Sequence, residues 1–385
     1  MAVLLRRGDV LLPSGARVVA DVRLDGTLID RIGHDLPSAG AVCFDATGML
    51  VAPGFIDLHV HGAGGGMCED ADPAALERIS TTLARGGVTR FLATIAALPV
   101  EQLRAAVAAV AAYAGREPGA RIAGIHLEGP YLNPQRAGAQ TAAWMRAPSI
   151  DEFDALQALA RGRIRLITVA PEIEGALPFI AALRERGVTV AIGHSDATAT
   201  EAGRGVGAGA SHVTHLCNAM RPLHHREPGV VGAALTEDAL SVELICDGHH
   251  VAPAVIDLVW RCKPPGKVVL VSDGVAPLGM PDGDYALFGV ACRKRAGAVR
   301  LGNGDRLAGS CLSLDQAVRN LRQWLPRRPV EEILASAASA PAAVIGESSA
   351  GVIAAGHAAD VVVLDADLQV VATICGGQIV WQGPS

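Results

Sequence analysis

Short apolar runs alternate with amphipathic segments through the middle of the chain, and this alternation predicts the fold class. The apolar runs that we interpret as strands lie at residues 55–60, 88–94, 121–127, 164–169, 188–193, 211–216, 241–246 and 267–272. The segments that we interpret as helices lie at residues 73–85, 100–113, 151–160, 176–186, 198–206, 254–262, 313–324 and 329–338. Eight strand–helix units over roughly 250 residues are typical of a (β/α)8 TIM-type barrel. The alternative is a doubly wound open sheet, which would have fewer strands and a crevice at a switch point.

Both ends of the chain follow a different, β-rich pattern. Residues 3–33 contain short strand-like runs, with Asp25-Gly26 as a predicted hairpin turn. Residues 359–383 return to the same pattern, with Gly376-Gly377 as a second hairpin turn. Within the middle, residues 278–306 break the alternation and predict one or two inserted hairpins. We therefore expect a small β-sandwich made by both ends and a barrel between them, divided as residues 1–51, 52–349 and 350–385.

Composition and charge exclude several classes of partner. The net charge is −6 and no basic patch is present, so we expect no nucleic-acid partner. Arg6, Arg7 and Asp9 interrupt the apolar start, which argues against a signal peptide. No run approaches the ~18 apolar residues of a membrane span. Eight cysteines without a CxxC motif predict reduced thiols and a cytoplasmic protein.

Side chains that bind metals gather where the predicted strands stop. His59 and His61 are two residues apart on a strand, so their imidazoles share one face, and Asp57 on that face could orient them. Further histidines and carboxylates end five more strands, at Glu128, His194, His215, His250 and Asp273. In a barrel these strand ends share the catalytic rim. Since buried imidazoles and carboxylates are costly without partners, we predict a divalent cation there; hydrogen-bonded core histidines are the alternative for the His59–His61 pair.

Nine motifs in order along the chain resemble those of the amidohydrolase superfamily and, within it, the N-acetylglucosamine-6-phosphate deacetylase family. They are PGFIDLHVHGAGG, HLEGPYLNP, GHSDAT, THLCNAM, HHREPG, DGHHV, VSDGVAP, LAGS and GHAADVVVLD. The resemblance covers essentially the whole length and implies a barrel with a small β-sandwich from both ends. It also implies metal-dependent hydrolysis of N-acetyl-D-glucosamine 6-phosphate to acetate and D-glucosamine 6-phosphate. The alternatives are N-acetylgalactosamine 6-phosphate or another N-acyl substrate and, more remotely, an inactive scaffold relative.

The resemblance also implies a role for individual positions. It assigns Glu128, His194 and His215 to the metal site that the family retains, and His59 and His61 to a second site that some members keep. Asp273 corresponds to the catalytic carboxylate and joins the metal ligands. Substrate contacts are implied for Ala139, Gln140, Asn218, Ala219, Arg226, His249, His250, Leu307, Ala308 and Gly309. We expect one or two divalent ions per chain, Zn²⁺ ahead of Fe²⁺, Mn²⁺ or Co²⁺.

The family resemblance further implies a homodimer. The sequence also departs from the family pattern at one position. In the dimer, Arg226 and His250 lie near the neighbouring subunit's site. Twelve residues beyond Glu128 the family commonly has a histidine, whereas this chain has Gln140. Glutamine forms hydrogen bonds but carries no charge, so the departure leaves the choice between gluco and galacto epimers open.

Overall fold

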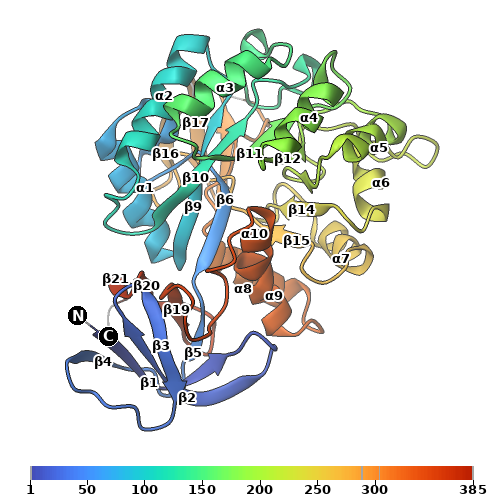
Figure 1. Ribbon diagram of the computed structural model, residues 1–385. Coiled ribbons are helices and arrows are strands. Elements are labelled where there is room, and N and C mark those ends of the chain that lie inside the picture. Colours follow the sequence, from blue (N-terminus) through green and yellow to red (C-terminus); the bar gives the residue numbers. More distant parts are fainter. Residues whose placement is uncertain (1, 288, 303, 384–385) are drawn as a thin grey trace.

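A computed structural model describes residues 2–287, 289–302 and 304–383, and its centre is a closed parallel barrel (Figure 1). Eight parallel strands lie side by side in chain order. They are β6 (Phe55–Val60), β9 (Val88–Ala96), β10 (Arg121–Glu128), β11 (Ile164–Val169), β12 (Thr189–Ile192), β13 (His212–Val213), β14 (Ser241–Leu244) and β15 (Val268–Leu270). A parallel bridge between Val60 and Gly274 joins the first strand to the segment that follows the last. The sheet is therefore the predicted (β/α)8 barrel and not a doubly wound open sheet.

One helix follows each barrel strand, and Figure 1 shows these helices around the strands. They are α1 (Pro73–Arg85), α2 (Val100–Tyr113), α3 (Ile150–Leu159), α4 (Ala176–Glu185), α5 (Ala199–Ala208), α6 (Gly229–Thr236), α7 (Pro253–Cys262) and α8 (Leu314–Trp324). Asp72 caps the N-terminus of α1, because its side chain accepts a hydrogen bond from the Ala74 amide at 3.0 Å. Helix α6 was not predicted, since its sequence GVVGAALT carries two glycines and a weak helical preference.

Two more helices follow the barrel and lead back to the terminal strands. They are α9 (Val330–Ala337), which was predicted, and α10 (Ser339–Val344), which was not. The helix break falls at Ala338, where the backbone leaves helical geometry. The pattern over residues 329–338 therefore predicted one helix of the pair.

Both chain ends form one eight-stranded sheet, as the β-rich pattern predicted. Its strands are β1 (Ala2–Leu11), β2 (Arg17–Asp25), β3 (Leu28–Gly33), β4 (Ala41–Asp45), β5 (Leu50–Pro53), β19 (Val361–Leu364), β20 (Val370–Cys375) and β21 (Gln378–Gln382). Strand β5 joins the two ends because it pairs with both β1 and β19. The hairpin after β2 turns at Gly26-Thr27, one residue later than predicted, and the hairpin after β20 turns at Gly376-Gly377. The boundaries proposed near residues 51 and 349 stay predictions.

The predicted insertion forms a small antiparallel sheet beside the barrel. Its strands are β16 (Gly283–Leu287), β17 (Val290–Arg295) and β18 (Ala298–Leu301). Leu287, Cys292 and Val299 pack with Met67 and Val275, which belong to segments that follow barrel strands. The insertion is thus anchored at the end of the barrel that carries the site.

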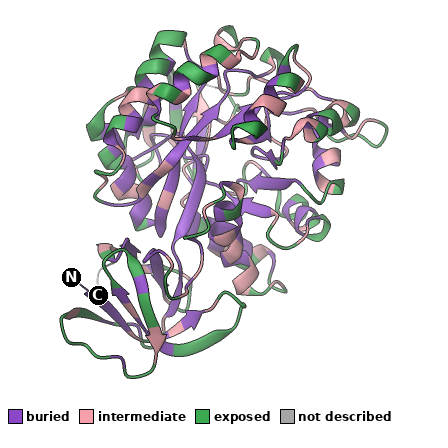
Figure 2. Cartoon of the chain, in the orientation of Figure 1, coloured by how far each residue is buried: buried purple, intermediate pink, exposed green. Residues whose placement is uncertain are grey.

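The strands of the barrel are almost entirely buried (Figure 2). The terminal sheet attaches to the barrel through the buried carboxylate of Asp360. This carboxylate pairs with Arg90 Nε at 2.6 Å and accepts a hydrogen bond from the Gly376 amide at 2.7 Å. None of the helices in the described part of the chain has the length and apolar character that a membrane crossing requires.

Candidate metal centre and substrate cavity

Five of the predicted metal ligands converge on one point at the carboxyl ends of the barrel strands. Glu128 ends β10, and its carboxylate lies among four imidazoles. The Nε2 distances to its oxygens are 3.3 Å for His59, 3.2 Å for His61, 3.0 Å for His194 and 2.9 Å for His215. These groups form two sets of three donor atoms that lie within 4.8 Å of one another, and both sets contain Glu128. The strand ends therefore bring together side chains that are up to about 150 residues apart in the sequence.

The donor atoms fit a divalent cation. Nε2 of His59 lies 3.3 Å from Nε2 of His61, and Nε2 of His194 lies 3.1 Å from Nε2 of His215. Three of the rings bind other groups through Nδ1: His59 binds Glu243 at 3.0 Å, His61 binds Glu69 at 3.0 Å and His194 binds the Arg136 carbonyl at 2.8 Å. Because Nδ1 is held elsewhere, Nε2 is the ring nitrogen that faces the centre, as in histidine ligation of metals.

The electrostatic field at the centre favours positive charge. Burial by itself lowers the pKa of His59 and His61, but the neighbouring carboxylates outweigh burial. The pKa of His59 is well above its usual value, mainly through the charges of Glu128 and Asp273, and that of His61 is raised to about 10. A bound cation would satisfy the same carboxylates.

Asp273 completes the group from the segment after β15. Its Oδ1 atom lies 3.4 Å from Nε2 of His59 and 3.7 Å from Nε2 of His61. His194, His215 and Asp273 all have a left-handed backbone, with φ of 47°, 30° and 49°. This region is uncommon for residues other than glycine and is typical of constrained functional positions. The strands therefore end earlier than the apolar pattern predicted, and the backbone turns at the residues that carry the chemistry.

Two carboxylates that the sequence reading missed support the histidine pair. Glu243 is fully buried and contacts Nδ1 of His59 at 3.0 Å, Nε2 of His212 at 3.1 Å and the amide of His215 at 3.0 Å. Glu69 accepts hydrogen bonds from Nδ1 of His61 and from a backbone amide, both at 3.0 Å. The signal for Glu243 was a charged residue inside the apolar strand SVELIC.

Asp57 supports the histidine pair through the backbone. It is fully buried, and its Oδ1 accepts hydrogen bonds from the amides of His59 and Ser272, each at 3.2 Å. Burial raises the pKa of Asp57 to about 7. Asp57 thus supports the backbone of two strand ends and does not contact the imidazole rings by a hydrogen bond.

A cavity of about 240 Å³ opens onto the metal ligands. Seven of the ten predicted substrate contacts line it: Ala139, Gln140, Asn218, Ala219, His250, Leu307 and Gly309. Ala308 is buried behind this wall in the cluster that anchors the insertion. Arg306 also lines the cavity and was not predicted.

Gln140 lies directly against the metal centre. Its Nε2 donates a hydrogen bond to Glu128 Oε2 at 2.6 Å, and its Oε1 accepts one from the Ala97 amide at 2.9 Å. The side chain is therefore fixed at both ends. The position that departs from the family pattern is part of the site and orients a predicted metal ligand.

The other two predicted contacts lie outside the cavity of their own chain. Arg226 is exposed on the loop before α6, where its Nη1 contacts His225 Nε2 at 3.1 Å. His249 is exposed, whereas its neighbour His250 binds Asp247 Oδ2 through Nδ1 at 2.7 Å. The structure of one chain therefore does not bring Arg226 or His249 into the site.

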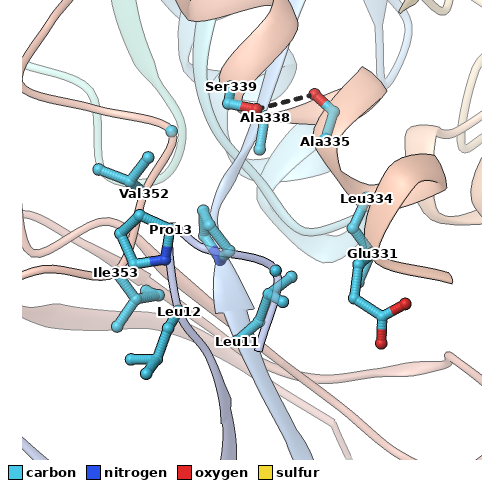
Figure 3. A pocket seen from close by; sticks show the side chains of 13 residues that line it. Leu11, Leu12, Pro13, Glu331, Leu334, Ala335, Ala338, Ser339, Val352 and Ile353 are labelled. Atoms are coloured by element: carbon cyan, nitrogen blue, oxygen red, sulfur yellow. Dashed lines mark hydrogen bonds between the residues drawn. The ribbon is translucent and has the colours of Figure 1, made fainter. Parts of the chain in front are cut away.

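A second cavity, of about 130 Å³, lies where the terminal sheet meets α9 (Figure 3). Its lining is mostly apolar and includes Leu11, Leu12, Leu334, Val352 and Ile353. Glu331 is the sole ionisable residue among those that line it. This cavity lacks the converging ligands of the barrel site.

Comparison with known proteins gives consistent matches over nearly the whole chain. Residues 50–380 match the Amidohydrolase family. The chain is 40% identical to the N-acetylgalactosamine-6-phosphate deacetylase of Escherichia coli O157:H7, over 86% of this chain and 87% of that protein. It is 34% identical to the N-acetylglucosamine-6-phosphate deacetylase of Lysinibacillus sphaericus, over 98% of both. It superposes with a TM-score of 0.91, at 34% identity, on a Mycobacterium smegmatis N-acetyl-D-glucosamine-6-phosphate deacetylase mutant in complex with N-acetyl-D-glucosamine-6-phosphate, covering 98% of this chain and 99% of that one.

Proposed function

Because the chain belongs to the amidohydrolase family, we propose that it hydrolyses the acetamide of N-acetyl-D-glucosamine 6-phosphate. The products are acetate and D-glucosamine 6-phosphate. The observation that carries the proposal is the Glu128 carboxylate, surrounded by four imidazole Nε2 atoms, in a cavity that Asp273 also lines. Amide hydrolysis needs an activated water and a proton shuttle, and this arrangement offers groups for both.

Glu128, His194 and His215 would hold one divalent ion, and His59 and His61 would hold a second beside Glu128. When bound, such an ion supplies Lewis acidity, which lowers the pKa of water and polarises a carbonyl. We favour zinc, because imidazole and carboxylate oxygen are among its usual ligands. Asp273 takes a proton from the attacking water and returns it to the departing amine. Its place at the cavity wall supports this role.

The phosphorylated sugar would contact the residues around the cavity. Asn218, Ala219 and His250 line it, and His250 is oriented by Asp247. We propose that the enzyme is a homodimer and that Arg226 contacts the phosphate in the neighbouring subunit. The exposed position of Arg226, outside the cavity of its own chain, supports this arrangement. All eight cysteines are free thiols, which supports a cytoplasmic location.

The galacto epimer is a second candidate substrate, because a relative at 40% identity is named for N-acetylgalactosamine 6-phosphate. The test is to measure kcat/KM on both epimeric sugar phosphates together with the metal content of the purified protein. We expect the gluco epimer to be preferred. A higher value for the galacto epimer would reverse the assignment, and a metal-loaded protein without activity on either would favour an inactive relative.

The Asp273→Asn variant tests the mechanism. It should retain fold and metal but lose about 10²- to 10⁴-fold in kcat, because a positioned proton shuttle contributes that much. Near-normal turnover would exclude Asp273 as the proton shuttle. Metal content and circular dichroism serve as controls for folding.

Subunit mixing tests the shared site. Arg226→Ala chains and Asp273→Asn chains should each be poorly active alone. In a mixed dimer, one site combines a normal Asp273 with Arg226 of the other chain, so activity should return. If subunit exchange is demonstrated without recovery, each chain binds the phosphate by itself.

A further inference from the structure

One arginine lies at the wall of the substrate cavity, and the family motifs do not include it. Among the described residues that line the cavity, Arg306 is the only lysine or arginine. It follows the inserted sheet, where Leu301 N donates a hydrogen bond to the Arg306 carbonyl at 3.0 Å. An antiparallel bridge between Arg300 and Leu307 holds the same segment. The backbone at Arg306 is therefore held against the wall of the cavity.

The guanidinium of Arg306 has no ion-pair partner within residues 2–287, 289–302 and 304–383. Two other arginines near the site are engaged in ion pairs. Arg136 and Arg221 both bind Asp196, at 2.5 and 2.6 Å. An unpaired guanidinium beside a cavity is available to an anionic ligand.

The residues that line the cavity include both acidic and basic side chains. Glu128 and Asp273 contribute carboxylates at the metal centre, whereas Arg306 comes from the insertion. His250 also lines the cavity, and the charge of Arg300 acts on it. A ligand that carries both an amide and an anionic group matches this combination of lining residues.

We propose that Arg306 binds the phosphate of the sugar from within the same chain and so determines the preference for phosphorylated over free amino sugars. This proposal rests on the proposed function and adds a residue to it. A phosphate has several oxygens that accept hydrogen bonds, so Arg306 and the neighbouring subunit's phosphate contact are compatible. The guanidinium fork donates two parallel hydrogen bonds to phosphate, and lysine does not reproduce that geometry.

The experiment compares N-acetylglucosamine 6-phosphate with unphosphorylated N-acetylglucosamine in the wild type and in Arg306→Ala, Arg306→Gln and Arg306→Lys. We expect Arg306→Ala and Arg306→Gln to raise KM for the phosphorylated sugar about 10- to 100-fold, as for the loss of a charged hydrogen bond, with little change in kcat. KM for the free sugar should stay unchanged. Inorganic phosphate should inhibit these variants less, and Arg306→Lys should fall between them and the wild type.

Arg295→Ala is the matched control, because Arg295 is exposed on the same inserted sheet and does not line the cavity. It should behave as the wild type. Equal losses on both sugars, or unchanged inhibition by phosphate in all three Arg306 variants, would overturn the proposal. If the wild type hydrolyses neither sugar, the proposed function fails, and calorimetric titration with inorganic phosphate still decides the role of Arg306.

Discussion

At the scale of single residues, Glu243 links the two histidines of β6 and β13 to the metal centre. Its fully buried carboxylate contacts His59, His212 and the His215 amide. Such outer carboxylates fix the orientation of a ligating imidazole and raise its basicity. Glu243 therefore explains why His59 presents Nε2, rather than Nδ1, to Glu128.

We predict that Glu243→Gln lowers affinity for the ion at His59 and His61 about 10- to 100-fold, which is usual for the loss of such a partner. The ion at Glu128, His194 and His215 should be retained. Metal content after dialysis against graded chelator measures both. Glu185→Gln, at an exposed helical position, is the control, and equal ion retention in the two variants would contradict the prediction.

His250 predicts a pH dependence of substrate binding. Burial alone lowers the pKa of His250, but the hydrogen bond to Asp247 and the charges of Asp247 and Asp273 together outweigh burial and raise it above the usual value. The imidazolium therefore persists to higher pH than in a free histidine, and its attraction for phosphate disappears as pH rises through the raised pKa. KM for the phosphorylated sugar should increase over that range in the wild type. The rise of KM with pH should be absent in His250→Gln. If His250→Gln shows the same dependence of KM on pH as the wild type, His250 does not bind phosphate.

Among the elements, the loop after β10 lines the cavity and is held by a carboxylate from the segment after β12. Arg136 closes a short 3-10 helix, Pro134–Arg136, ahead of Ala139 and Gln140. Asp196 binds Arg136 Nη2 at 2.5 Å and Arg221 Nη2 at 2.6 Å. The loop is thereby fixed to the segment that carries His194.

We predict that Asp196→Ala loosens this loop. The free energy of unfolding should fall by only about 1 kcal/mol, because the ion pairs are partly exposed. Amide exchange at residues 137–141 should become faster, and KM should rise. Asp154→Ala, which removes an exposed pair with Arg186 elsewhere, should leave exchange in the loop unchanged; a loop equally protected in both variants would refute the role of Asp196.

In the whole molecule, an ion pair between the partly buried Arg90 and the buried Asp360 joins the barrel to the terminal sheet. Arg90 belongs to β9 and Asp360 immediately precedes β19, and their side chains are 17% and 3% exposed. Loss of Asp360 is costly because it leaves Arg90 with the more distant Glu347 carboxylate, at 3.6 Å, and leaves the buried Gly376 amide without its acceptor.

We predict that Asp360→Ala lowers the free energy of unfolding by about 3 kcal/mol. Asp284→Ala, which breaks the exposed pair with Arg293, should change it by less than about 1 kcal/mol. Chemical denaturation with fluorescence detection measures both. Similar values for the two variants would show that the Arg90–Asp360 pair contributes little to the attachment of the sheet.

Local sequence patterns predicted most helices and strands and the types of side chain at the site. The periods of apolar residues predicted the eight strands and seven of the eight helices that follow them, since each period depends on neighbours a few residues apart. Motifs such as HVH and GHSD located the metal-binding side chains, because two or three adjacent residues carry the signal. These inferences needed only local order along the chain.

Tertiary structure alone decided which groups meet. Barrel closure places Glu243 behind His59, although 184 residues separate them, and no local pattern encodes a contact of that range. Likewise, Gln140 reaches Glu128, and Arg306 lines the cavity while Arg226 stays outside it, because folding of the loops and the insertion sets these positions. Strand lengths also depended on the fold: the backbone turns into left-handed geometry at His194, His215 and Asp273. Tertiary contacts maintain those unfavourable backbone angles, so the apolar pattern of the strands does not predict them.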